Sequence, residues 1–290
     1  MTIRQLTDFV IESVNLNSPP RTIESIIYEK LRETLPEIVA TEKAAEFSPK
    51  IFARLGQIHK RAVEQREDTK FVFNSSSPYF IQGPYFDEPR DPEVIKTAKL
   101  ARAQASQILT ALHSLTFTEF ECLCASVLKE LGASQVVRTP HSEDQGIDFY
   151  GKLNLGQLVP DFPFLRLEDS ISVWLIGQAK HYPSRSVKVS DVRELAGSIL
   201  LARHQEYTVK DIYPDLRARS CDPVLGLFIT SGTFTRGSHL IGAASGIVCK
   251  DGTQLSNFLA DRRCGFIQES KGLVFSEREF RKWLEMSNKE

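Results

Sequence analysis

A carboxylate, an amide and an ammonium group occur at spacings that can place them around one point. Asp148 ends the segment Gly146-Ile147-Asp148, and Gln178 and Lys180 flank Ala179 at the end of an apolar run. Residues two apart on a strand share one face of a sheet, so Gln178 and Lys180 point the same way and Ala179 turns into the core. If the segment of Asp148 forms the neighbouring strand, the three side chains converge.

Such a group suits a hard divalent cation. Mg²⁺ prefers oxygen ligands and keeps several waters. Asp148, the Gln178 amide oxygen and the Ala179 backbone carbonyl would supply such ligands, and Mn²⁺ could substitute. Lys180 would orient or deprotonate a water, or stabilise charge on a phosphate, as metal-assisted attack on a phosphodiester requires. We expect Asp148 and Lys180 to be exposed polar groups.

Two glutamates compete for a place beside this group. Thr116 and Glu119 form a capping-box pattern at the start of a helix. Glu121 lies about 100° round that helix from Phe120, at the margin of the buried face, and Glu119 lies at the opposite margin. Because capping already explains Glu119, Glu121 is the better site candidate.

Other polar residues near these segments have more ordinary interpretations. Asp161 also precedes Gln178 at a sequence separation that would allow it to replace Asp148 as the carboxylate of the site. It stands between Pro160 and Pro163, where a central strand is disfavoured, so Asp148 is preferred.

Asp144 is either a further ligand or a loop residue. His141 and His181 lack a partner at metal-ligand spacing. The stretch Gly232 to Gly237 lacks the lysine of a phosphate loop, although the helix start at Thr233–Arg236 could contact a DNA phosphate.

Two different patterns of hydrophobic and polar residues predict two kinds of structure around these residues. Residues 1–70 show helical periodicity, with a capping box at Thr2 and Gln5, and 74–91 are rich in Ser, Pro and Gly and predict a linker or exposed loop. One long helix is expected over 92–113, with an Ala-rich seam that favours packing within the chain over a dimer contact. Helices and strands then alternate, which indicates an α/β layer structure. Expected helices are 1–16, 23–31, 51–67, 117–131, 190–205, 236–246, 252–262 and 276–286; expected strands are 71–73, 135–139, 146–152, 171–180, 224–229 and 247–249.

Bulk composition restricts the function only weakly. The chain has 290 residues, a formal net charge of −1 and 41% hydrophobic residues, which suits one large or two ordinary globular domains. A nucleic-acid enzyme of this charge must localise its cations. The five cysteines form no C-x-x-C pair, which argues against zinc and favours reduced thiols in the cytoplasm. The first residues are not typical of a signal peptide, and we expect no membrane span.

Five ordered segments resemble one nuclease family. They are Phe120-Glu121, Asp144 to Asp148, Gln178 to Tyr182, Phe228 to Thr235, and Lys250-Asp251-Gly252 with Leu255. Together they are similar to the Mrr-like branch of the PD-(D/E)XK restriction endonucleases, in which glutamine often stands at the position of Gln178. The proline-containing loop between Asp148 and Gln178 departs from the family's pattern and leaves the strand pairing open.

The resemblance implies a fold, an activity and partners. The fold would be α/β, a restriction-endonuclease-like mixed sheet flanked by helices, with an N-terminal helical region. The activity would be Mg²⁺-dependent hydrolysis of double-stranded DNA, in restriction or defence against foreign DNA in a bacterial cytoplasm. A homodimer and a defence-system partner protein stay open. The alternatives are a nuclease-fold protein that binds DNA or a partner without cutting, and a nuclease for branched DNA or RNA.

We expect four regions along the chain. The first would recognise a target or partner, the third would hold the catalytic residues, and the others would connect or extend them. They are a recognition region (1–90), a connecting helix (91–115), the nuclease domain (116–265) and a C-terminal helical extension (266–290).

Overall fold

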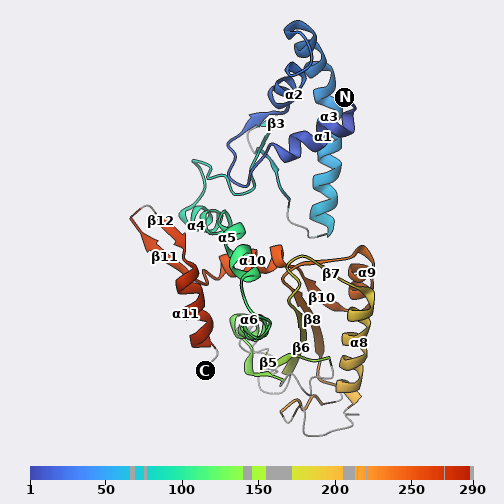
Figure 1. Ribbon diagram of the computed structural model, residues 1–290, viewed down its shortest axis with the longest axis vertical. Helices are drawn as coiled ribbons and strands as arrows, with labels where there is room; N and C mark the ends of the chain where they lie inside the picture. The colour runs from blue at the N-terminus through green and yellow to red at the C-terminus, as the bar shows by residue number, and fades with distance from the viewer. Residues whose placement is uncertain are drawn as a thin grey trace, which may run out of the picture. The chain divides into compact units, whose positions relative to one another are not determined.

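The computed structural model divides the chain into two compact units, Met1–Ala103 and Gln104–Glu290 (Figure 1). The structure describes all residues except 66–68, 75–76, 140–145, 155–171, 205–212, 214, 220, 271 and 288–290. Within the part that is described, no helix is both long enough and apolar enough to span a bilayer.

The N-terminal unit combines three helices with a small antiparallel sheet, followed by a fourth helix. The sheet has the order β1-β3-β2, and the helices bury an aliphatic core that includes Leu6, Ile27, Ile51 and Leu55. The capping box of Thr2 and Gln5 begins the first helix, as predicted. The elements are α1 (Ile3–Glu12), β1 (Arg21–Thr22), α2 (Ile23–Arg32), α3 (Glu37–Gln65), β2 (Val72–Asn74), β3 (Ser77–Gln82) and α4 (Glu93–Arg102).

Two predictions for this unit were wrong. The third helix begins at Glu37 rather than at residue 51, and it continues through Pro49. The expected linker over 74–91 contains β3, the middle strand of the sheet, whose Ile81 is fully buried. Proline is tolerated in this middle strand because the paired residues of β3 are Ser77 and Phe80 to Gln82, which leaves Pro78 outside the ladder.

The C-terminal unit is built on a mixed five-stranded sheet with the order β10-β8-β6-β5-β4. Strands β10, β8 and β6 run parallel, and β6, β5 and β4 are antiparallel. The α/β mixed sheet flanked by helices is thus confirmed. The elements are α5 (Ala105–His113), α6 (Phe117–Glu130), β4 (Ser134–Arg138), β5 (Phe149–Asn154), β6 (Ser172–Lys180), β7 (Ser186–Val187), α8 (Val189–His204), β8 (Val224–Thr230), β9 (Thr233–Phe234), α9 (Arg236–Ser245), β10 (Ile247–Lys250), α10 (Gly252–Asp261), β11 (Phe266–Glu269), β12 (Gly272–Phe275) and α11 (Glu277–Ser287).

Helices α6 and α8 cover opposite faces of this sheet (Figure 1). Gly151 of β5 lies against Leu128 of α6. Tyr150 and Ile176, which alternate to the other face, pack with Ala202 of α8. Even-numbered residues of β6 therefore face α8, and odd-numbered residues face α6.

The single helix expected over 92–113 is two helices, α4 and α5, which meet at Ala103 and Gln104. Gln104 leaves helical geometry, and its side-chain amide binds a hairpin formed by β11 and β12. Its Nε2 donates to the Leu273 carbonyl at 2.9 Å, and its Oε1 accepts from the Phe275 amide at 2.8 Å. This hairpin lies in the region expected to be a helical extension, and α11 follows it.

Candidate active site

Asp148 lies directly beside β6, although a long insertion separates the two in sequence. Strand β5 pairs antiparallel with β6, with Phe149 opposite Gly177, so the register places Asp148 opposite Gln178. The Asp148 amide donates to the Gly177 carbonyl at 2.9 Å. Its carboxylate Oδ2 accepts from the Ala179 amide at 2.6 Å. The strand pairing that the sequence left open is therefore resolved, and Asp148 is held by the backbone of the segment that carries Gln178 and Lys180.

A glycine makes this close strand pairing feasible. The ring of Phe149 lies across Gly177, where an added Cβ would come within 2.1 Å of a ring carbon. Any side chain at position 177 would push Phe149 away, and with it the start of β5. The Gly177–Phe149 contact thus fixes the position of Asp148, the residue before Phe149.

Gln178 is buried, with 1% of its surface exposed, on the face that α8 covers. Its Oε1 has no hydrogen-bond partner among the described residues. A buried acceptor left without a partner costs about 1–3 kcal/mol. Amide and carboxylate oxygens are the ligands that a hard cation prefers, so Gln178 and Asp148 fit a divalent metal by their chemistry.

Lys180 is the last residue of β6 and shares the face of Gln178. Its carbonyl accepts from the Thr230 hydroxyl at 2.7 Å, which ties the end of β6 to the end of β8. Lys180 is half-buried, and no carboxylate in the described part of the chain pairs with its ammonium group. Its charge is therefore not cancelled by a described carboxylate.

Glu121 is buried on α6, with 5% of its surface exposed, rather than at the margin of the helix. Burial raises the pKa of the Cys124 thiol well above its ordinary value, and the charges of Asp148 and Glu121 raise it further. Glu121 and Asp148 thus act on the same buried thiol of α6.

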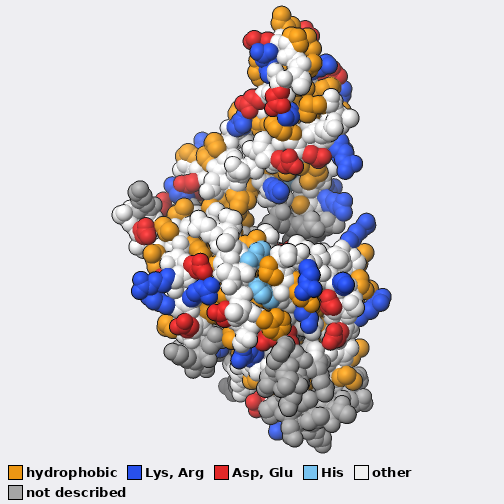
Figure 2. Space-filling view, viewed as in Figure 1, with side chains coloured by type: hydrophobic (Ala, Val, Ile, Leu, Met, Phe, Trp, Pro, Cys, Tyr) orange, Lys and Arg blue, Asp and Glu red, His pale blue; other side chains and the backbone are white. Residues whose placement is uncertain are grey.

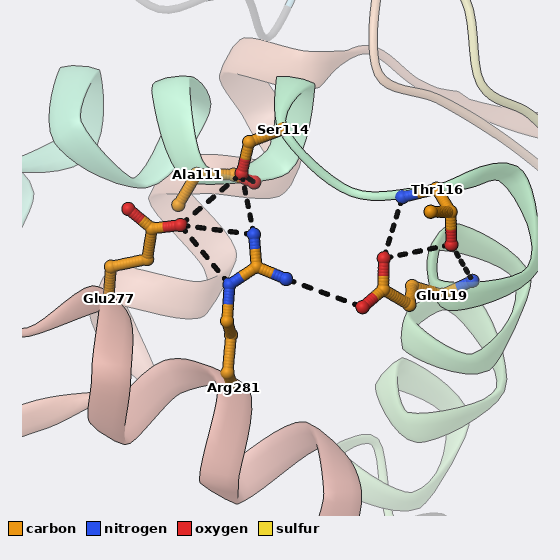
Figure 3. A network of polar contacts seen from close by, with 6 residues as sticks. All are labelled: Ala111, Ser114, Thr116, Glu119, Glu277 and Arg281. Atoms are coloured by element: carbon orange, nitrogen blue, oxygen red, sulfur yellow. Dashed lines mark hydrogen bonds and ion pairs between the residues drawn. The ribbon is translucent and has the colours of Figure 1, made fainter.

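Glu119 has a different environment, shown in Figure 3. It completes the capping box with Thr116, as predicted, and pairs with Arg281 of α11 at 3.3 Å. Hydrogen bonds from the Thr116 backbone and then from its hydroxyl lower the pKa of Glu119. Arg281 also binds Glu277 and Ser114, so Glu119 belongs to a network that joins α5, α6 and α11.

The exposure predicted for Lys180 is wrong, because this residue is half-buried. The exposure predicted for Asp148 is also wrong. Only 4% of its surface is exposed, because its carboxylate bonds to the backbone of β6.

Asp144, Asp161 and His141 lie outside the described residues. No cluster of three His, Cys, Asp or Glu side chains that could hold a metal occurs in the described ranges. The ligand set expected here contains only one such side chain, Asp148, because its other ligands are the Gln178 amide oxygen and the Ala179 backbone carbonyl.

Comparison with known families decides the class of this domain. A family model described as restriction endonuclease, of the Mrr catalytic type, matches residues 112–259, just over half of the chain. The chain belongs to this Mrr restriction endonuclease family. The match runs from the end of α5 to α10 and includes all five strands of the main sheet.

Solved structures of restriction endonucleases also align with the chain. MspJI in complex with a 27-mer oligonucleotide aligns at 18% identity and a TM-score of 0.40, over 71% of this chain and 40% of that one. The modification-dependent enzyme AspBHI gives 18% and 0.35, over 69% and 41%. FokI bound to DNA gives 11% and 0.37, over 89% and 45%. The chain thus spans less than half the length of these structures, and no curated protein matches it.

The structure of this Mrr domain brings a carboxylate to the segment before Asp148 that the sequence did not indicate. Gly146 has a left-handed φ of +83° and sits against α8, where an added Cβ would lie 2.7 Å from Ser198 Oγ and 3.6 Å from Glu194 Cγ. Glu194 is an exposed position of an ordinary helix, so its type and spacing gave no signal. Only the packing of Gly146 against α8 brings Glu194 near the segment that leads to Asp148.

His181 has a structural environment in the Mrr domain. It follows Lys180 and faces α6, where its ring packs on Phe120 with centroids 5.1 Å apart. Burial lowers the pKa of His181, and the nearby His113 lowers it further. His113 binds the Ser231 carbonyl at 2.9 Å. These contacts agree with the expectation that His181 points away from Lys180.

Proposed function

We propose that the C-terminal unit is a metal-dependent endonuclease that hydrolyses phosphodiester bonds of double-stranded DNA and acts in restriction of foreign DNA in the cytoplasm. Membership of the Mrr restriction endonuclease family supports the reaction class. The observation that carries the proposal is the Gln178 oxygen without a described partner, on a residue that the register places opposite Asp148.

Each residue of the candidate site has a role in this proposal. Asp148, Gln178 and the Ala179 carbonyl would hold a Mg²⁺ ion, and Glu121 is proposed as a further ligand; Asp144, proposed from the sequence alone, lies outside the described residues. The ion, when bound, would activate water and offset phosphate charge. Lys180 orients the attacking water or stabilises the charge of the phosphate. The amide of Ala179 holds the Asp148 carboxylate in place.

Removal of metal is expected to abolish cleavage. Plasmid DNA, methylated and unmethylated, should be nicked or linearised with Mg²⁺ or Mn²⁺ and stay intact with EDTA. Because an ion that binds only the folded state stabilises it, Mg²⁺ should also raise the melting temperature by an amount that grows with its concentration. Cleavage that persists in EDTA would contradict the metal-dependent reaction. Competing branched DNA and RNA substrates would show whether duplex DNA is preferred.

The two glutamates of α6 should respond differently to the same substitution. Glu121→Gln removes the buried carboxylate proposed as a further metal ligand and should lower cleavage by roughly 10²-fold or more. Glu119→Gln is the matched control, which should weaken the cap and the Arg281 pair by about 1 kcal/mol and leave cleavage intact. Initial cleavage rates and urea unfolding of both variants measure the two effects. An inactive Glu119→Gln with an active Glu121→Gln would reverse the assignment.

We further propose that the N-terminal unit directs the choice of target. Its helices α2 and α3 are joined by four residues, a spacing that suits a helix-turn-helix. In helix-turn-helix proteins the second helix of the pair reads the major groove. The helices α2 and α3 would occupy these positions. Helix α3 carries the exposed cation Arg54, together with Lys50 and Lys60, which pair with glutamates of the same helix.

A further inference from the structure

A short ribbon beyond the candidate site carries cations without carboxylates. Strands β7 and β9 follow the carboxyl ends of β6 and β8 and pair in parallel, with Ser186 opposite Thr233. Residues 180–190 and 230–240 contain Lys180, Arg185, Lys188 and Arg236 but no Asp or Glu, in a chain whose net charge is −1. Positive charge is therefore concentrated at this edge of the sheet.

The backbone of the ribbon fixes these cations close to one another. Gly232 packs against the carbonyls of Tyr182 and Arg185, where an added Cβ would come within 2.1 Å of an oxygen. The Val187 carbonyl accepts both from the Thr235 amide at 3.2 Å and from the Ser238 hydroxyl at 2.7 Å. The start of α9, with Arg236, is thereby held beside Lys188.

Protein carboxylates do not neutralise these side chains. Arg185, Lys188 and Arg236 are exposed, and within the described ranges none of them forms an ion pair. The Arg185 guanidinium lies over the Tyr182 ring at 4.5 Å, which orients it without cancelling its charge. The nearest acid in sequence, Asp191, accepts from the Lys188 backbone amide.

Figure 2 shows Lys and Arg side chains over the part of the C-terminal unit that Figure 1 labels β7, α8 and α9. The hydroxyls of Ser186 and Thr233, 2.8 Å apart and exposed, add hydrogen-bonding groups to the same ribbon. Cations together with hydroxyls are the groups that contact DNA phosphates.

We infer that the β7–β9 ribbon, with Arg185, Lys188 and Arg236, binds the DNA phosphates that flank the scissile bond. The inference rests on the proposed function, because Lys180 connects the ribbon to the candidate site through only a short turn. The contacts are to the backbone, so they position the duplex and carry no sequence preference.

The test is a triple variant, Arg185→Ala with Lys188→Ala and Arg236→Ala, in the full chain. The matched control is Arg203→Ala with Arg262→Ala and Arg278→Ala, which removes three exposed cations elsewhere in the same unit. Affinity for a labelled duplex is measured without divalent metal over a range of salt concentrations. Each lost phosphate contact lowers the slope of log affinity against log salt by about one. The ribbon variant should lose a slope of about three and bind roughly tenfold or more weakly.

The outcomes separate this inference from the proposed function. Equal binding by the ribbon variant and the unaltered chain would overturn the inference while leaving the nuclease proposal in place, as would equal losses in the ribbon and control variants. Absence of both duplex binding and metal-dependent cleavage in the unaltered chain would overturn both. An unchanged Mg²⁺-induced rise in melting temperature in the ribbon variant would confirm that its metal site is intact.

Discussion

Lys180→Ala is expected to abolish metal-dependent DNA cleavage and to leave the fold unchanged. Lys180 is half-buried at the end of β6 and has no carboxylate partner among the described residues, so its ammonium group contributes little to stability. Loss of a group that orients water or stabilises phosphate charge should lower the rate by roughly 10²–10⁴-fold. Single-turnover cleavage rates and the denaturant midpoint measure the two quantities. Full nicking activity would remove Lys180 from the site.

Asp148 requires two substitutions, because its carboxylate has a structural contact. Asp148→Ala leaves the buried Ala179 amide without its acceptor and should cost about 1–3 kcal/mol of unfolding free energy. Asp148→Asn retains an acceptor oxygen and removes the charge, so it should fold well and still fail to cleave. An Asp148→Asn variant that cleaves normally and still shows a Mg²⁺-induced rise in melting temperature would contradict the metal site.

The second large effect is expected from removal of the N-terminal unit. A fragment of residues 104–290 should fold, retain metal-dependent cleavage and lose its preference among DNA targets. The boundary matters, because Gln104 binds the β11–β12 hairpin and must be kept. A fragment from Asp91 would carry α4, which clusters with the other unit. Full chain and fragment are compared on one mixture of DNA sequences, methylated and unmethylated.

Two results would change this assignment. Unchanged preference in the fragment would place target choice in the nuclease domain itself. A fragment that fails to fold, with a broad denaturant transition, would show that the two units depend on each other for stability. A second fragment from residue 115 is the matched control, since it lacks α5 and Gln104 and should be less stable.

The sequence was most informative where residue type alone determines local structure. Capping boxes at Thr2 and Thr116 and the apolar runs of β6 and β8 predicted helix starts and buried strands correctly. The α/β architecture and the family followed from the order of such elements. These features depend on contacts within a few residues, which periodicity and spacing can show.

The failures have a different physical origin. β3 was mistaken for a linker because Ser and Pro at its start outweigh Ile81, whose burial depends on helices elsewhere in the unit. The break at Gln104 depends on a hydrogen bond to Phe275, far along the chain. Burial of Asp148 follows from its bond to Ala179 across strands. The proximity of Glu194 to Gly146 follows from the packing of Gly146 against α8. Each case is a long-range contact that local sequence does not specify.

The amide of Gln104 also has a consequence for self-association. One primary amide donates to Leu273 and accepts from Phe275, as a peptide group of an adjoining strand would. It therefore occupies part of the outer edge of β12, which has only β11 as a strand partner in the described sheets. Unoccupied strand edges are templates for pairing with another chain and for aggregation. A single side chain thus protects a two-stranded hairpin from β-augmentation, without an additional strand.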